Sequence, residues 1–247
     1  MMAAPLAPLL WWQGKRVRRI TPVLPEAAGP RAGQWRCNGA DTEVNALRVL
    51  LLGDSSAAGV GASHQDEALS GQLGVHLRAH LGRSLPRSVA WTLCARTGLR
   101  TREAQELLHD LPAQPFDVAV VALGVNDVTA LQRSARWIAD VDDLRIRLRD
   151  QLGVAQVLWS GLPPMHQFPA LPQPLRAVMG RHARDLDAAL ARYARRLQGG
   201  VRHVPMPSMS RPEWIATDGF HPGPQAYAVW AGVLAQALVH TVAECPR

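Results

Sequence analysis

The sequence predicts an α/β protein: a three-layer α/β/α sandwich with a mostly parallel, five-stranded sheet. Short apolar runs with little polar alternation, typical of strands buried on both faces, alternate with longer segments whose apolar residues recur at helical spacing. The chain has 247 residues, of which 47% are hydrophobic, enough for one domain with a sizeable core. We expect this domain over residues 46–247, after an apolar and basic arm and an irregular linker over 1–45.

The first half of the domain contains two expected strands and two helices. Residues 47–52 are an apolar run that stops at Gly53, which predicts a buried strand. Residues 69–81 have leucines four positions apart, which places them on one helical face. A second apolar run, 89–94, predicts a strand, and residues 101–109 predict a short helix.

The second half repeats this alternation. Residues 116–123 form another apolar run, and apolar residues at helical spacing predict a helix over 131–152, which ends at Gly153. The remaining expected strands are 154–159 and 201–204, and the remaining helices are 175–197 and 225–238. Because strand–helix–strand crossovers are right-handed and return each strand in the same direction, we expect the loops that follow the strands to meet at one edge of the sheet.

Residues suited to nucleophilic catalysis follow these strands. Ser55 lies just after the first strand, at the kind of position where open parallel sheets bind ligands. A serine nucleophile needs a base, usually a histidine oriented by a third group, and donors for the developing oxyanion. His221 and Asp218 share one short loop and suit the first two roles. The amide of Asn126 and the backbone N–H of Gly98 could be the donors.

Four short sequence blocks occur in an order that matches a known family. They are GDSS at 53–56, ARTG at 95–98, GVND at 124–127 and DGFHP at 218–222. With these blocks the chain resembles the SGNH hydrolases, also called GDSL esterases and lipases. The order of the blocks, and their positions after successive strands, make the set more specific than any one tripeptide. The resemblance implies a flavodoxin-like strand order.

The resemblance also implies a role for each matching residue. Ser55 would be the nucleophile, His221 the base and Asp218 its orienting carboxylate. The backbone N–H groups of Ser55 and Gly98, with the amide of Asn126, would form the oxyanion hole. The implied activity is that of a carboxylic ester hydrolase with an acyl-enzyme intermediate, and we expect no metal or cofactor.

Other interpretations remain open at this stage. The same chemistry serves thioesterases, lysophospholipases and carbohydrate deacetylases, and a non-catalytic lipid-binding or partner-binding protein could keep the fold. Taken singly, Ser55 could cap the following helix and Asn126 could lie in an ordinary turn. The proline-rich segment 161–174 could line an acyl pocket with Met165 and Phe168, or could be a rigid connector.

The amino-terminal segment is apolar over residues 3–12, and a basic cluster follows it at Lys15, Arg16, Arg18 and Arg19. This order is the reverse of a secretory signal, and ten apolar residues are too few to span a bilayer. The segment could contact a membrane surface through Leu9, Leu10, Trp11 and Trp12, or could be a flexible or packed arm.

Charge and cysteine content suggest the compartment and partners. The formal net charge is +7, but most arginines lie on expected helix faces, so we expect no nucleic-acid partner. Three scattered cysteines, Cys37, Cys94 and Cys245, form no disulfide framework and suit a reducing compartment. We expect a cytoplasmic protein, peripheral on the inner face of the membrane if the arm contacts lipid, that acts on a small-molecule or lipid ester.

Overall fold

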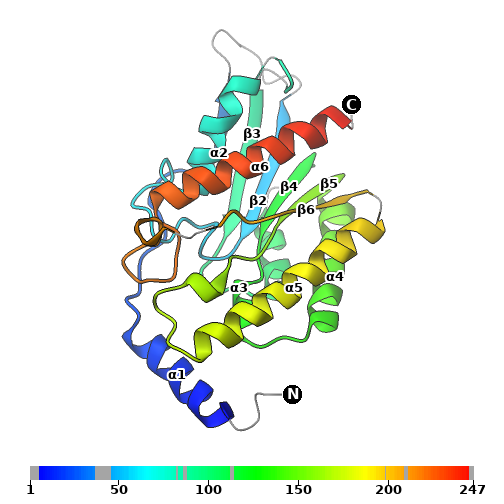
Figure 1. The fold of residues 1–247 in the computed structure, drawn as a ribbon. Helices are drawn as coiled ribbons and strands as arrows, with labels where there is room; N and C mark the ends of the chain where they lie inside the picture. The colour runs from blue at the N-terminus through cyan, green and yellow to red at the C-terminus, as the bar shows by residue number, and fades with distance from the viewer. Residues whose placement is uncertain are drawn as a thin grey trace.

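The computed structural model describes residues 6–36, 46–81, 83–85, 88–111, 114–197, 199–208 and 211–244. A six-stranded sheet lies between two layers of helices (Figure 1). Its strands, in spatial order, are β1 (Ala32–Arg36), β3 (Ser88–Ala95), β2 (Leu47–Gly53), β4 (Val118–Ala122), β5 (Gln156–Ser160) and β6 (Val201–Val204). Strands β2 to β6 are parallel, and their order is the flavodoxin-like one that the resemblance implied.

Each face of the sheet is buried against its own helices. On one face, residues such as Leu50 and Leu52 of β2 pack with the layer formed by η3 (Glu103–Asp110), α4 (Ser134–Leu152) and α5 (Leu175–Leu197). On the other face, Val49 and Leu51 pack with α2 (Leu69–Leu77) and α6 (Pro224–Glu244). Burial on both faces explains why β2 is an almost unbroken apolar run.

The helix α6 is long and apolar enough to cross a membrane. Its buried residues, however, form one face that packs on the sheet and on α2, and they include Tyr227, Trp230 and Leu234. In this fold α6 is therefore a core helix, and its apolar character comes from its place between the sheet and α2.

Local helix geometry differs from the sequence expectation in three places. The expected helix over 69–81 ends as α2 at Leu77 and continues as the 3₁₀ turn Arg78–His80. The expected helix over 101–109 is the 3₁₀ helix η3. The helix expected over 131–152 begins only at Ser134, because Leu131 has a φ of 54° and cannot continue a right-handed helix.

The sheet has one strand more than the sequence analysis expected. Residues of the supposed linker form β1, which pairs antiparallel with the edge of β3. Trp35 of β1 stacks on Trp91 of β3 with ring centroids 5.5 Å apart, and its indole lies against Gly74 of α2. The expectation of an irregular linker is wrong here because β1 is stabilised by these distant partners and has no apolar alternation of its own. Residues 37–45 lie outside the described residues.

The arm contains a helix, α1 (Ala7–Ile20), that packs beside the start of α5 (Figure 1). The Gln13 side chain is buried; its Nε2 donates to the carbonyl of Gln173 at 2.7 Å, and its Oε1 accepts the N–H of Leu175 at 3.1 Å. Leu10 and Val17 are half-buried against the core. Leu10 therefore faces the protein with part of its side chain, unlike Leu9, Trp11 and Trp12, which are exposed.

Trp35→Ala should lower the free energy of unfolding by about 3–5 kcal/mol, because Trp35 is only 8% exposed and a cavity would remain between β1, β3 and α2. Urea unfolding followed by circular dichroism measures the change. Val23→Ala is the matched control, since Val23 is 95% exposed and should change stability by less than about 0.5 kcal/mol. A loss of less than 1 kcal/mol in Trp35→Ala would show that β1 contributes little to the fold.

Candidate active site

Ser55 lies in a tight turn directly after β2. The strand ends at Gly53, where a Cβ atom would lie 2.6 Å from the carbonyl oxygen of Ala122 in β4, so no side chain fits. The Asp54 carboxylate accepts the backbone N–H of Ser56 through Oδ1 at 3.0 Å, which closes the turn. The turn lifts Ser55 out of the sheet at its carboxyl edge.

The loop that contains Asp218 and His221 reaches the same edge from the far end of the sequence. His221 Nε2 lies 2.9 Å from Ser55 Oγ, and His221 Nδ1 lies 2.5 Å from Asp218 Oδ2. The second carboxylate oxygen, Oδ1, accepts the backbone N–H groups of Phe220 at 2.9 Å and of His221 at 3.0 Å. The structure thus brings together the three residues that the sequence analysis proposed as nucleophile, base and orienting group.

The environment of Asp218 favours its ionised form. Burial raises the pKa of this carboxyl, but the hydrogen bonds from His221 and from the two backbone N–H groups outweigh burial and hold its pKa below the usual value. An ionised Asp218 keeps a proton on His221 Nδ1, which leaves Nε2 free to accept the proton of a hydroxyl. The arrangement can therefore activate Ser55.

Contacts between the two loops hold this geometry. Gly61 lies in the serine loop with a φ of +100°, and a Cβ there would come within 2.2 Å of the carbonyl oxygen of Pro222. Tyr227 at the start of α6 donates its hydroxyl to the carbonyl of Val60 at 2.7 Å. The serine loop is therefore packed directly against the histidine loop, and both are anchored to α6.

The candidate oxyanion donors are the backbone N–H groups of Ser55 and Gly98 and the side-chain amide of Asn126. Gly98 has a φ of +85° with open space where a side chain would lie. Within the described part of the chain, the backbone N–H groups of Ser55 and Gly98 have no hydrogen-bond partner. Asn126 lies on the short helix α3 (Val125–Thr129), and its Nδ2 donates to the carbonyl of Leu99 at 2.9 Å and, over a longer 3.3 Å, to Asp54 Oδ2. An oxyanion could replace this longer, weaker bond.

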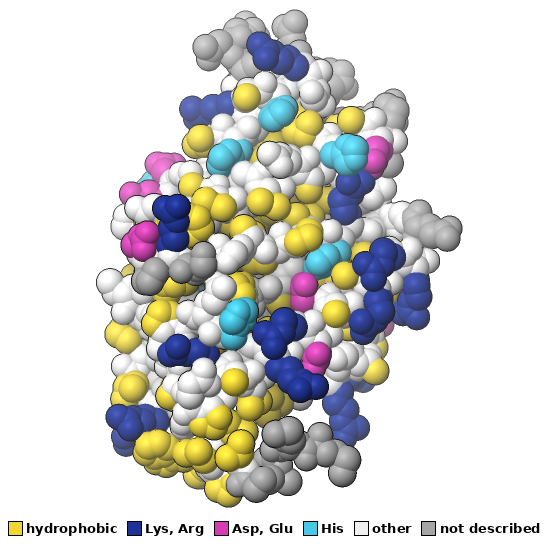
Figure 2. All heavy atoms as spheres, viewed as in Figure 1, with side chains coloured by type: hydrophobic (Ala, Val, Ile, Leu, Met, Phe, Trp, Pro, Cys, Tyr) yellow, Lys and Arg dark blue, Asp and Glu magenta, His cyan; other side chains and the backbone are white. Residues whose placement is uncertain are grey.

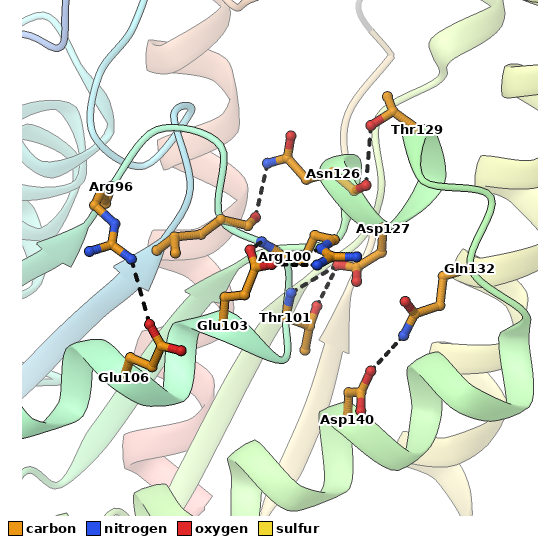
Figure 3. Close-up of polar contacts among 11 residues, drawn as sticks. Arg96, Arg100, Thr101, Glu103, Glu106, Asn126, Asp127, Thr129, Gln132 and Asp140 are labelled. Atoms are coloured by element: carbon orange, nitrogen blue, oxygen red, sulfur yellow. Dashed lines mark hydrogen bonds and ion pairs between the residues drawn. The ribbon is translucent and has the colours of Figure 1, made fainter. Parts of the chain in front are cut away.

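A buried network joins the Gly98 loop to α3 (Figure 3). Asp127 Oδ2 accepts the backbone N–H of Thr101 at 3.0 Å and its hydroxyl at 2.8 Å, and the indole of Trp137 donates to the same hydroxyl oxygen at 2.9 Å. Asp127 and Thr101 are fully buried. The two candidate donors, Gly98 and Asn126, therefore lie on loops that are fixed relative to each other.

The sequence of residues 51–229 matches the GDSL-like lipase/acylhydrolase family. This chain belongs to that family. A GDSL-like esterase of Mycobacterium tuberculosis is 28% identical over 205 residues, which are 80% of this chain and 63% of that relative. The chain therefore spans less than two thirds of this relative's length.

Solved structures with the same fold include two esterolytic enzymes. An extracellular lipase from Streptomyces rimosus superposes with a TM-score of 0.55 at 20% identity and covers 78% of this chain and all of that chain. A carbohydrate esterase family 2 enzyme from Corynascus thermopiles gives a TM-score of 0.64 at 14% identity and covers 82% of this chain and 68% of that chain. At these identities the likeness shows the fold.

An apolar pocket of about 40 Å³ lies beside Ser55 and His221 of this GDSL-like protein. Its walls include Asp54 and Ser56 next to the candidate nucleophile, and Phe220 next to His221. Further lining residues come from five other places in the chain: Leu123, Val125, Gly161, Leu162, Pro163, Phe168, Met206, Ile215 and Trp230.

The proline-rich segment 161–174 reaches this pocket through only one of the two residues expected there. Phe168 lines the pocket and contacts Phe220 edge to face with centroids 5.0 Å apart. The expectation for Met165 is wrong: it is fully buried in the core and does not line the pocket. Met165 begins a 3₁₀ turn, Met165–Gln167, which directs its side chain inward.

Sequence reasoning missed two side chains that hold the Gly98 loop. Glu26 Oε1 accepts both the backbone N–H and the hydroxyl of Thr97, each at 2.8 Å. Arg31 donates to Glu26 Oε2 at 2.8 Å and to the carbonyl of Ala95 at 2.8 Å. Both residues belong to the segment expected to be a linker. No local pattern marks them, because their partners lie about 65 to 70 residues away.

Asp54 is a further site residue that the sequence analysis did not single out. Its carboxyl is buried, and burial raises its pKa to about 7 despite the N–H of Ser56 and the nearby His221, which lower it. Because Asp54 contacts both Ser56 and Asn126, its protonation state affects both the serine turn and a candidate oxyanion donor. The signal that could have found it is its place in the GDSS block.

Other reactive side chains have structural partners of their own. His203 pairs with Asp187 at 2.8 Å, and Asp187 also accepts the N–H of Leu162, so this pair holds the pocket wall. Burial raises the pKa of the Cys94 thiol to about 11, in keeping with a packing role. Cys37 and Cys245 lie outside the described residues. In the described part of the chain, no three His, Cys, Asp or Glu side chains form a group suited to a metal ion.

Asp54→Asn should remove a pH dependence of stability. The native carboxyl keeps its proton up to about pH 7, whereas the unfolded chain releases it near 3.8. Between these values the unfolded state binds fewer protons, so the wild-type free energy of unfolding should fall as pH rises, by about 1.4 kcal/mol per pH unit relative to the variant. Urea unfolding of both proteins from pH 4 to 7 measures this difference. Parallel curves would mean that Asp54 is ionised throughout.

Proposed function

We propose that this GDSL-like protein hydrolyses carboxylic esters with Ser55 as nucleophile, through an acyl-enzyme intermediate. The observation that supports this most directly is the continuous hydrogen-bond chain from Ser55 Oγ to His221 Nε2 at 2.9 Å, and from His221 Nδ1 to Asp218 at 2.5 Å. Membership of a family of lipases and acylhydrolases supports the same reaction class. Ester bonds suit a site in which a serine, its base and unpaired N–H donors converge.

The proposed reaction has two halves. His221 Nε2 takes the Ser55 proton as Oγ attacks the ester carbonyl carbon, and the tetrahedral intermediate collapses when His221 returns this proton to the departing alcohol. In the second half His221 takes a proton from water as the water oxygen attacks the acyl-enzyme carbonyl carbon. The second tetrahedral intermediate collapses when His221 returns this proton to Ser55 Oγ, which releases the acid and free Ser55. Asp218 stays ionised and stabilises the imidazolium that forms in each half.

The negative oxygen of both intermediates would lie among three donors. The backbone N–H groups of Ser55 and Gly98 are unpaired within the described chain and can donate at once. Asn126 would exchange its long bond to Asp54 for a shorter one to the oxyanion. Loss of one such donor typically costs about 10²–10³ in kcat.

The pocket beside the triad suits a short acyl group. Its free volume of about 40 Å³ holds only a few water-sized spheres, and its walls are mainly apolar. Among the reactions that share this chemistry, the pocket favours removal of acetyl to butyryl groups, including acetyl groups on sugars, over cleavage of long-chain lysophospholipids.

The test of the proposed function is hydrolysis of p-nitrophenyl acetate by wild type and three variants. Ser55→Ala and His221→Ala should each lower kcat by at least 10⁴, because the nucleophile or its base is lost. Asn126→Ala should lower kcat by about 10²–10³ with little change in KM. Ser63→Ala and His240→Ala are matched controls from the exposed surface and should keep wild-type rates. Wild-type activity in Ser55→Ala would exclude Ser55 as nucleophile.

Acyl-chain preference should follow the pocket. With p-nitrophenyl esters from acetate to palmitate, kcat/KM should be highest from acetate to butyrate and should fall at least tenfold by octanoate. Leu162→Ala removes part of the pocket wall, so it enlarges the pocket and should shift the optimum to longer acyl chains. Leu131→Ala is the control: Leu131 is 57% exposed and does not line the pocket, so the optimum should not change. A palmitate optimum in wild type would show that the acyl chain lies elsewhere.

A further inference from the structure

The helix α1 is held to the body of the protein by one face only. Gln13 is 6% exposed and makes two hydrogen bonds to the chain just before and at the start of α5, and Leu10 and Val17 pack beside it. These three positions are spaced three and four residues apart, as expected for one face of a helix. The rest of α1 therefore faces solvent in a fixed orientation.

The outward face of α1 combines large apolar side chains with cations. Trp11 is 64% exposed, Trp12 52% and Leu9 41%. Figure 2 shows hydrophobic side chains gathered at this end of the molecule with basic side chains beside them. The exposed cations of α1 are Lys15, Arg16, Arg18 and Arg19, and α1 contains no acidic residue.

The aromatic and basic residues of this face are in contact with one another. The Lys15 ammonium lies 3.9 Å from the centre of the Trp11 ring, and the Arg16 guanidinium lies 5.4 Å from the centre of the Trp12 ring. Tryptophan side chains favour the boundary between lipid headgroups and acyl chains, and lysine and arginine favour anionic headgroups. The two preferences are met together at the surface of an anionic bilayer.

The helix α1 is linked by hydrogen bonds, through the proline-rich segment, to a loop at the carboxyl edge of the sheet. Gln13 bonds to Gln173, at the end of the proline-rich segment, and the backbone N–H of Ala170 in that segment donates to the carbonyl of Gly219 at 3.0 Å. Gly219 is two residues from His221. The helix α1 is thus attached to the proline-rich segment, which in turn contacts the loop of His221.

We propose that α1 binds the surface of an anionic membrane and places the active site at that surface, so that the enzyme acts on short-chain esters anchored in lipid. The substrate part of this proposal rests on the proposed function. A helix of 14 residues is about 21 Å long, too short to cross the hydrocarbon core, so α1 lies in the interface. A second copy of the chain is a poorer partner, because two copies of this face would bring eight cations together without an acidic residue.

Vesicle sedimentation tests the docking step. Wild type should bind vesicles of phosphatidylcholine with 30% phosphatidylglycerol at least tenfold more tightly than vesicles of phosphatidylcholine alone, and less tightly at high salt. Trp11→Ser/Trp12→Ser should lower the partition coefficient at least tenfold. Lys15→Gln/Arg16→Gln should lower it about 25-fold, about fivefold for each charge removed. Arg78→Gln/Arg147→Gln removes two exposed cations elsewhere and should bind like wild type.

Three results would overturn the docking proposal. The first is binding by Trp11→Ser/Trp12→Ser as tight as that of wild type, and the second is no binding of wild type to the anionic vesicles. The third is a wild-type dimer in light scattering that the same double variant converts to a monomer, which would assign the face to self-association. The substituted side chains are exposed, so unchanged thermal unfolding should confirm that the variants fold.

Activity separates the docking proposal from the proposed function. Trp11→Ser/Trp12→Ser should hydrolyse dissolved p-nitrophenyl acetate at the wild-type rate, but should cleave hexadecyl acetate in the anionic vesicles at least tenfold more slowly. If wild type and Trp11→Ser/Trp12→Ser cleave hexadecyl acetate at equal rates, the proposal that docking brings the enzyme to lipid-anchored esters is overturned. If wild type binds the vesicles and cleaves neither ester, the proposed function fails and the docking surface stands.

Discussion

The parallel pairing of β2 with β4 is the constraint on which the active site depends. Gly53 is in register with Ala122, and the N–H of Asp54 donates to the carbonyl of Ala122 at 3.2 Å. The two strands therefore finish at the same level, and Ser55 and Asn126 leave the sheet side by side. A side chain at position 53 would separate the strands and move the serine turn away from α3.

Three buried carboxylates organise the site, and each one does so differently. Asp218 accepts two backbone N–H groups and a histidine, so it stays ionised and orients His221. Asp127 accepts two hydrogen bonds from Thr101 and thereby fixes the Gly98 loop. Asp54 is buried and accepts the N–H of Ser56 and a longer bond from Asn126, but burial outweighs these contacts and raises its pKa to about 7. Burial also raises the pKa of Asp127. The balance between burial and hydrogen bonding decides how each carboxyl group behaves.

Residues of the amino-terminal segment stabilise the sheet and the loops near the candidate site. Its strand β1 extends the sheet, Glu26 and Arg31 hold the loop that contains Gly98, and Gln13 attaches α1 beside the proline-rich segment. These contacts join residues of the first 36 positions to three separate parts of the sheet edge. They explain how one surface helix can be held in a fixed place relative to the loops around Ser55 and His221.

The sequence by itself determined the five parallel strands, the helices between them and the residues that meet at the site, because apolar periodicity and short motifs are local properties of the chain. The tertiary structure decided the pairing of β1 and the hydrogen bonds of Glu26 to Thr97. It also decided that the side chains of Leu10 and Met165 point toward the core, and it set the pKa of Asp54. Each of these depends on partners distant in sequence, and a buried position or a raised pKa exists only after those partners have excluded water.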